Sequence, residues 1–325
     1  MEKIRLRPDY EIPVIRDTYE MIIPNKKGVR VYRASKKYKP KSRSKEVRAI
    51  NSIPKKLEYA KKNDKLEIYQ LFHNNDAFKN CFDTEYITRL SLNPNFITAD
   101  PTVLFVKDIK HITNQISETR AFLYLGNKDI RCDYVGFTSH RHNGKFYAQD
   151  RSISIEDINL DIVRKVFDTC LPVKMIGFRL HPAHDFISTV QIGDKTGVPD
   201  FMYGFFRDCY HFDRPSYNNM LKSMDGKIFP YCNSFILPRL EFKNYVTFVS
   251  EFLDWADGKY GLDKVRLAVD RVKRSYSPDR GWGYLCEQLP WYYLTFKYVK
   301  NFVMAFIDDE HKITYHDRIG YQIEG

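Results

Sequence analysis

Residues 133–146 read DYVGFTSHRHNGKF. The pattern of a buried strand ends there in three polar side chains, His140, Arg141 and His142, and Asn143 and Gly144 follow as residues typical of a turn. Ligands of open α/β sheets gather at the carboxyl ends of strands, so this strand tip predicts a binding site. Arginine binds phosphate groups bidentately, and imidazole donates hydrogen bonds or binds metal. A solvated loop whose cations face water is the alternative.

Runs typical of strands and runs typical of helices alternate on both sides of this tip. Strand character is found in residues 66–72, 102–106, 133–138, 173–178, 227–237 and 301–307. Helical spacing of apolar residues predicts helices over 108–128, 154–170, 239–261 and 281–296, the second with Ser154 as its N-cap. Strands separated by helices predict an α/β fold in which helices flank a mixed sheet.

Positive charge is concentrated at one end of the chain. The whole sequence has 52 Lys and Arg against 41 Asp and Glu, a net charge of +11, whereas residues 1–65 hold 20 against 8, a net charge of +12. We therefore expect two parts, a basic extension over 1–65 and a globular domain over 66–325. Within the extension, residues 19–24 and 29–34 flank the turn Asn-Lys-Lys-Gly and predict a β-hairpin.

The densest basic run interleaves cations with Tyr32 and Tyr38. Its candidate nucleic-acid contacts are Arg30, Arg33, Lys36, Lys37, Lys39, Lys41, Arg43 and Lys45. Such a run suits a phosphate backbone, because counterions are released on binding and the rings stack on exposed bases. A flexible solubilising tail and an electrostatic tether to anionic lipid are the alternatives.

Cysteine spacing and hydropathy indicate a cytoplasmic protein. The six cysteines form no Cys-x-x-Cys pair, which argues against a disulfide framework or a structural zinc site. The first residues, MEKIRLRPDYEIP, lack the apolar core of a signal peptide, and Lys297 and Lys300 interrupt the most apolar late stretch. Abundant Tyr, Phe, Lys and Asn suggest a tailed phage or its bacterial host as the source. We expect a soluble protein in that cytosol.

Four stretches together resemble successive motifs of a known family. They are residues 117–128 (SETRAFLYLGNK), 133–146, 233–257 (NSFILPRLEFKNYVTFVSEFLDWAD) and 279–289 (DRGWGYLCEQL). The family is the glycosyltransferase-like family of capsule and lipopolysaccharide clusters, which is similar to nucleotide-sugar transferases of GT-A fold. The resemblance spans about residues 66–300, with matches at Glu118, Gly136, Arg141, Asn233, Arg280, Gly283 and Glu287. In direct register Ser139 stands where the family has His, and His140 where it has Tyr; a one-residue shift, which restores the His, is the alternative.

The resemblance implies a GT-A-like (Rossmann-like) fold and sugar transfer from a nucleotide-sugar, most commonly UDP-linked. It implies donor pyrophosphate binding by His140, Arg141, His142, Arg280 and Glu118, and catalysis by Arg141 and Glu287. Cations stabilise the departing diphosphate, and a carboxylate takes the proton of the acceptor hydroxyl. A structural ion pair between Glu287 and Arg280 is the alternative for that carboxylate.

Many GT-A enzymes hold Mn²⁺ or Mg²⁺ with an Asp-x-Asp at this strand tip, where the present sequence has Ser-His-Arg-His. We expect the cations to replace the metal, and a divalent metal held differently is the alternative. His181, His184 and Asp185 are a further candidate metal cluster, or residues of a substrate loop.

Two acceptors and one unrelated function stay open. Phage-type DNA carrying 5-hydroxymethylcytosine accounts for the basic extension, the composition and the transferase-like core together. A capsular or lipid-linked surface glycan is the alternative acceptor. A nucleic-acid-binding protein or nuclease without sugar chemistry is the alternative function. Asp200 with Glu241 and Lys243 superficially resembles a nuclease set, but the gap between them is long and Lys243 falls on a predicted amphipathic helix rather than a strand.

Overall fold

The structure is a computed structural model. It describes residues 20–25, 28–33, 65–107, 109, 116–182, 197–224, 227–230, 232–261, 281–299, 301–318 and 321–323. The chain divides into two compact units, Met1–Lys62 and Asn63–Gly325. In the first unit, β1 (Glu20–Asn25) and β2 (Gly28–Arg33) pair antiparallel with Asn25 opposite Gly28, which confirms the predicted hairpin. Lys36, Lys37, Lys39, Lys41, Arg43 and Lys45 lie outside the described residues.

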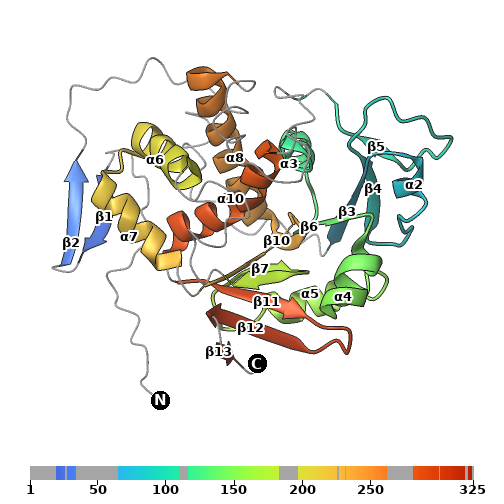
Figure 1. The fold of residues 1–325 in the computed structure, drawn as a ribbon. Coiled ribbons are helices and arrows are strands. Elements are labelled where there is room, and N and C mark those ends of the chain that lie inside the picture. Colours follow the sequence, from blue (N-terminus) through green and yellow to red (C-terminus); the bar gives the residue numbers. More distant parts are fainter. Residues whose placement is uncertain are drawn as a thin grey trace. The chain divides into compact units, whose positions relative to one another are not determined.

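The second unit is built on a nine-stranded mixed sheet (Figure 1). The strands are β3 (Leu66–Phe72), β4 (Ile87–Ser91), β5 (Leu104–Phe105), β6 (Tyr134–Ser139), β7 (Val173–Gly177), β10 (Phe235–Pro238), β11 (Val303–Ile307), β12 (Ile313–Arg318) and β13 (Tyr321–Ile323). Their spatial order is β13-β12-β11-β7-β10-β6-β3-β4-β5. The neighbours β5, β4, β3 and β6 are parallel, and β10 is antiparallel to both β6 and β7.

This strand order creates a switch point in the sheet. From β3 the chain steps outward to β4 and β5, and β6 then pairs with the opposite side of β3. The connections on either side of such a point leave in opposite directions, so a crevice opens at the carboxyl ends of the two strands. Because β10 runs antiparallel, its amino end lies at the same edge of the sheet. Residues from three strands therefore meet there.

Helices cover both faces of the sheet (Figure 1). One face carries α3 (Thr119–Gly126), α8 (Arg239–Tyr260) and α10 (Gly281–Tyr298), and α5 (Leu160–Phe167) lies on the other. Alternate strand residues point to opposite faces. Phe137 of β6 packs on Phe122 of α3, with ring centroids 4.5 Å apart, whereas Ile68 and Ile236 join the core around α5. The predicted α/β fold with a mixed sheet flanked by helices is confirmed.

The remaining elements border this core. They are α2 (Asn75–Phe78), the π-helical turn η2 (Asn143–Tyr147), α4 (Ala148–Asp150), α6 (Gly197–Tyr210), α7 (Arg214–Met224) and the two-stranded sheet of β8 (Leu180–Pro182) with β9 (Ile228–Pro230). Among the described residues, no helix is both long and apolar enough to cross a membrane.

Three sequence predictions are corrected by the fold. The helix expected over 154–170 begins only at Leu160, because the side chain of Asn159 caps it by accepting from the backbone nitrogen of Ile162 at 3.0 Å. Of the helix expected over 108–128, residues 108 and 110–115 lie outside the described residues, and the α-helix begins at Thr119 rather than at 116–118. The strand expected over 227–237 is two strands in different sheets. Cys232 and Asn233 separate these strands with left-handed φ angles of 59° and 51°.

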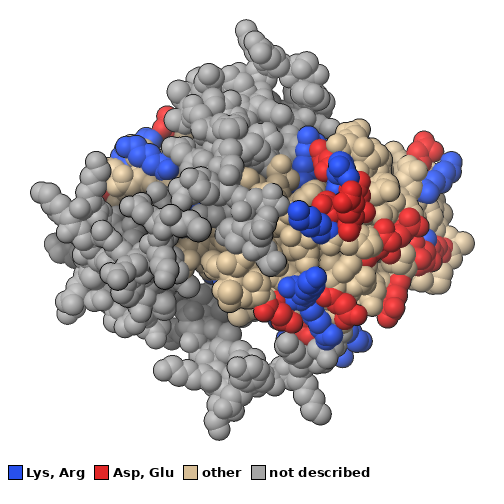
Figure 2. Space-filling model, turned by 90° about the horizontal axis from the view of Figure 1, so that it is seen from below, with Lys and Arg blue, Asp and Glu red and all other residues tan. Residues whose placement is uncertain are grey.

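Charges on the second unit are mixed in sign. Arg151 pairs with Asp309 and Glu310 at 3.2 and 3.1 Å, and Arg131 pairs with Asp129 at 3.0 Å. Figure 2 shows cationic and acidic side chains of the described part next to one another on one face. This distribution agrees with the net charge of −1 left for residues 66–325 once the basic extension is subtracted.

Candidate active site

The switch point brings the ends of β3 and β6 together. The ring centroids of His73, just after β3, and His140, just after β6, lie 5.5 Å apart. The backbone nitrogen of His140 donates to the carbonyl of Leu71 at 2.9 Å, and its Nδ1 lies 3.4 Å from the same oxygen. These bonds prolong the β3–β6 pairing by one residue, so they hold His140 at the strand tip.

His140 in turn orients Arg141. A carbonyl oxygen only accepts hydrogen bonds, so Nδ1 of His140 carries the hydrogen. Burial lowers the pKa of His140, so the neutral ring has a lone pair on Nε2, which accepts from Nε of Arg141 at 3.4 Å. The backbone nitrogen of Arg141 donates to Oγ of Ser139 at 3.1 Å. Arg141 is exposed and has no ion pair with any described residue, so its two terminal nitrogens are available to an anion.

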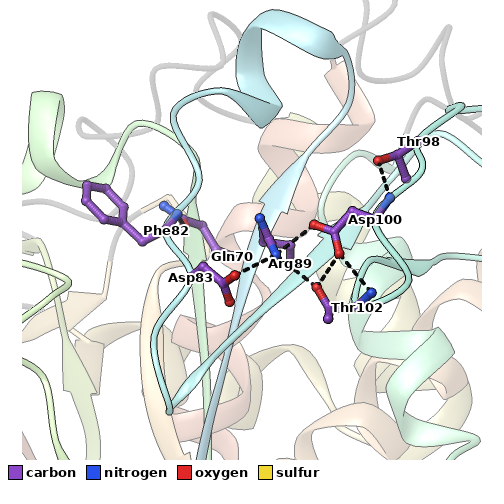
Figure 3. Close-up of polar contacts among 7 residues, drawn as sticks. All are labelled: Gln70, Phe82, Asp83, Arg89, Thr98, Asp100 and Thr102. Atoms are coloured by element: carbon purple, nitrogen blue, oxygen red, sulfur yellow. Dashed lines mark hydrogen bonds and ion pairs between the residues drawn. The ribbon is translucent and has the colours of Figure 1, made fainter.

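A polar network on β3 and β4 joins chain segments beside this tip. The side chain of Gln70, on β3, donates to the carbonyl of Ser139 at 3.3 Å and accepts from the backbone of Phe82 at 2.8 Å. Arg89, on β4, contacts Asp83 at 3.1 Å, Asp100 at 2.7 Å and Thr102 at 2.9 Å, as Figure 3 shows. Asp83 belongs to the segment between α2 and β4, and Asp100 and Thr102 belong to the loop between β4 and β5. One guanidinium therefore joins these two segments.

His142 does not belong to the exposed part of this tip. Its ring is fully buried beside Phe146 and Phe178. Nε2 donates to the carbonyl of Ile153 at 2.9 Å, which leaves Nδ1 to accept from the hydroxyl of Thr138 at 2.7 Å. Both ring nitrogens are thus bound within the protein. The resemblance implies that His142 binds the pyrophosphate of the nucleotide-sugar. Instead its ring has a structural role and anchors the loop after β6.

The two glycines that bracket the tip have different roles. A Cβ on Gly136 would lie 2.9 Å from Cγ1 of Ile68 and 3.1 Å from Cγ1 of Ile236. Gly136 therefore makes room for core side chains rather than for a ligand. Around Gly144, no atom lies within 4 Å of an added Cβ, so this position is open.

A second group of side chains lies at the amino end of β10. Nζ of Lys145 donates to Sγ of Cys232 at 3.2 Å. Burial and, to a smaller extent, the nearby charge of Glu287 raise the pKa of Cys232 to about 11, although Lys145 and Arg179 act to lower it. Glu287 is half-buried on α10. Lys145, Cys232 and Glu287 therefore form one cluster beside the strand tip.

Glu118 is a further charged residue near the strand tip. It precedes α3 at the N-cap position and makes no capping hydrogen bond with its side chain. Its charge raises the pKa of His140 and also that of Cys286, the neighbour of Glu287 on α10. The fold thus gathers Glu118, His140, Arg141 and Glu287 at one edge of the sheet. Arg280 lies outside the described residues.

The strand tip does not offer the ligands of a divalent cation. Ser139, His140 and Arg141 supply a hydroxyl, a ring whose nitrogens are engaged and a guanidinium, whereas Mg²⁺ and Mn²⁺ prefer carboxylate oxygens. Over the described ranges, no three His, Cys, Asp or Glu side chains converge as they would around a metal. Of the second candidate cluster, His181 is in β8, and His184 and Asp185 lie outside the described residues.

The carboxylates of the nuclease-like set have separate partners. Asp200, exposed on α6, accepts from Arg214 at 2.6 Å. Glu241, buried in the first turn of α8, accepts from the hydroxyls of Tyr293 and Tyr298 and from Lys297 at 3.3 Å. Lys243 is exposed on α8. Glu241 therefore joins α8 to α10, and the structure gives no support to a nuclease site built on these residues.

A cavity of about 610 Å³ lies at the opposite edge of the sheet. Its lining includes Glu67 and Tyr69 of β3, Thr88 of β4, and Tyr124 and Lys128 in and after α3. None of the predicted site residues lines this cavity. It is separate from the strand tip, because Leu66 and Glu67 begin β3, whereas the tip follows the end of that strand.

Comparison with known proteins gave one solved structure. No protein-family model and no curated protein matches the chain. The chain is similar to the apo structure of the WbbM bifunctional glycosyltransferase, with 14% sequence identity and a TM-score of 0.45. The match covers 72% of this chain and 42% of that chain, so this chain corresponds to less than half of WbbM. A similarity of this degree carries no argument about activity.

Proposed function

We propose that this protein is a glycosyltransferase that moves a sugar from a nucleotide-sugar donor, UDP-linked, to a hydroxyl acceptor. The observation that carries the proposal is the exposed guanidinium of Arg141, which His140 orients at the switch point of the sheet. Glu118 and Glu287 at the same edge supply carboxylates. The resemblance of four motifs over residues 66–300 supports the same function.

The chemistry follows from where the charges lie. As the bond between the sugar C1 and the diphosphate oxygen breaks, negative charge grows on that oxygen. A preoriented guanidinium at that position stabilises the transition state by about 3 kcal/mol. The acceptor oxygen bonds to C1, and its proton passes to Glu287, which is the general base of the proposed reaction.

Nucleotide release from a panel of nucleotide-sugars, with and without EDTA, tests this function. Wild-type protein is expected to release the nucleotide from at least one donor, and Arg141→Ala is expected to lower turnover about a hundredfold. Arg131→Ala is the matched control, because Arg131 pairs with Asp129 on the exposed surface away from the tip. Wild-type turnover in Arg141→Ala would remove this residue from the site, and activity abolished by EDTA would assign the positive charge to a metal.

For the acceptor we propose phage-type DNA that carries 5-hydroxymethylcytosine, since the excess positive charge lies in residues 1–65. Mass spectrometry of DNA and of cell-surface glycan after co-expression distinguishes this acceptor from a saccharide. An added pentose or hexose on the hydroxymethylated base is the expected result. The same mass found on glycan alone would overturn the DNA acceptor and leave the glycosyltransferase proposal standing.

A further inference from the structure

The turn before β10 has an unusual backbone. Cys232 and Asn233 both adopt left-handed φ angles, 59° and 51°. Asparagine tolerates this region better than most residues, but two successive non-glycine residues in it are costly. Such conformations persist where the surrounding structure holds them, and they cluster at ligand sites. Here Lys145 holds Cys232 through its sulfur, and Oγ of Ser234 donates to the carbonyl of Cys232 at 3.1 Å.

The amide of Asn233 is buried without a partner. Asn233 is 3% exposed, yet neither Oδ1 nor Nδ2 of its side chain makes a hydrogen bond with any described residue. Buried amides in folded proteins are nearly always hydrogen-bonded. A strained turn that holds a buried, unbonded amide therefore points to a partner that is not part of the chain.

The strand register places this amide beside the proposed donor site. Phe235 of β10 pairs with Phe137 of β6 and with Gly177 of β7. Asn233 precedes Phe235 by two residues, and it therefore lies at the edge where β6 continues into Ser139 and Arg141. The charge of Glu287 raises the pKa of Cys232, the neighbour of Asn233. Asn233 thus lies at the edge that holds the proposed phosphate-binding and proton-accepting groups.

A primary amide has both a donor and an acceptor and carries no charge, so it complements hydroxyl groups better than phosphate. We propose that Asn233 binds hydroxyl groups of the sugar moiety of the donor, and so contributes to the choice of sugar. This inference rests on the proposed glycosyltransferase function. It assigns the diphosphate to Arg141 on β6 and the sugar ring to the turn before β10.

Calorimetry with the full chain tests the assignment, with UDP, UDP-glucose, UDP-galactose and UDP-N-acetylglucosamine as probes. Asn233→Gly removes the amide and suits the left-handed backbone. We expect it to bind UDP within about twofold of wild type and to bind the preferred UDP-sugar at least about tenfold more weakly, because a site built around hydroxyl groups depends on each bond. Asn233→Asp keeps the shape of the side chain and loses the N–H donor, so we expect it to weaken the same UDP-sugar.

Asn159→Ala is the matched control, because the Asn159 side chain caps α5 with a bond inside the protein. Asn159→Ala is expected to lower thermal stability and to leave the affinities for UDP and for the preferred UDP-sugar unchanged. Asn233→Gly is expected to leave stability unchanged in the absence of ligand. Equal UDP-sugar binding by Asn233→Gly and wild type would overturn the inference alone. Wild-type protein that binds neither UDP nor any of the three UDP-sugars would overturn the UDP-linked donor of the proposed function, and this assignment with it.

Discussion

Arg141 and His142 are adjacent in the sequence and opposite in environment. Arg141 is exposed and His142 is fully buried. The chain turns into η2 after β6, and this turn packs the ring of His142 against Phe178 in the core around α5. A cluster of cationic residue types in a sequence can therefore mix exposed groups, which are accessible to a ligand, with buried structural ones. Their separation depends on which hydrogen-bond partners the neighbouring loop supplies.

His142 predicts a pH dependence of stability. Burial lowers its pKa to about 4, below the ordinary value near 6.5. Between these values the unfolded chain binds a proton that the folded protein does not. The free energy of unfolding should therefore fall by about 3 kcal/mol as the pH drops from 6.5 to 4 and stay unaffected by this residue above 6.5.

Urea unfolding at several pH values measures this contribution. It is the difference between wild type and His142→Gln in the slope of the free energy of unfolding against pH. His311→Gln is the control, since His311 is exposed in the β11–β12 turn. Parallel pH profiles for wild type and His142→Gln would contradict the prediction.

Glu287 predicts a separation of binding from chemistry. Glu287→Gln keeps the size and polarity of the side chain and removes its ability to accept a proton. We expect transfer to fall about 10²- to 10⁴-fold while calorimetry shows unchanged donor affinity. Glu310→Gln, an exposed carboxylate paired with Arg151, should leave both quantities unchanged. Full transfer by Glu287→Gln would assign the general base to another group.

At the scale of elements, close helix packing supports the edge that holds Glu118 and Glu287. Helix α3 lies directly against α8, and a Cβ on Gly126 would lie 2.3 Å from Cγ1 of Val246. Glu241 then joins the start of α8 to Tyr293 and Tyr298 of α10. The three helices are thereby tied to one another on the face that carries the predicted site residues.

Two helical glycines predict opposite effects of the same substitution. Gly126→Ala should lower the free energy of unfolding by about 1–3 kcal/mol, because the added methyl overpacks the α3–α8 contact. Gly258→Ala, in the last turn of α8 with nothing within 4 Å of an added Cβ, should raise it by up to about 1 kcal/mol. Urea midpoints measure both. Combining Gly126→Ala with Val246→Ala should restore part of the lost stability. Equal changes in the free energy of unfolding for Gly126→Ala and Gly258→Ala would contradict the close α3–α8 contact at Gly126.

At the scale of the whole molecule, the excess positive charge and the proposed catalytic groups lie in different parts of the sequence. Residues 1–65 hold a net charge of +12, and the remaining residues sum to −1. Polyanion affinity should therefore reside in the extension, while donor turnover should reside in the second unit.

Replacing the eight candidate cations of the extension with Gln in the full chain tests this division. Binding to duplex DNA, followed by fluorescence anisotropy over a range of salt, should lose up to about 7 in the slope of log affinity against log salt, near 0.9 for each phosphate contact. Donor turnover without DNA should stay at the wild-type level. Substitution of Lys79, Lys128, Arg131 and Lys312 in the second unit is the control. An unchanged slope in the eightfold variant would move the polyanion contact elsewhere.

The sequence by itself determined the α/β class, the hairpin of β1 and β2, the strands β3, β6, β7 and β11, and the long helices α8 and α10. Each of these is set by local periodicity, by turn residues or by a helix end such as Gly261, so the information lies within the segment itself. Helix α5 shows the limit, because Ser154 and Asn159 are both suitable caps and only packing selects the second.

Only the tertiary structure decided which polar residues share an edge and which are buried. The insertion of β10 between β6 and β7 brings Asn233 to the tip of β6, although about 90 residues separate them, and pairing over such a distance leaves no local pattern. The burial of His142 and the missing hydrogen bonds of Asn233 follow from the same assembly. Their physical cause is desolvation by neighbours that are remote in the sequence, and no spacing of residue types encodes it.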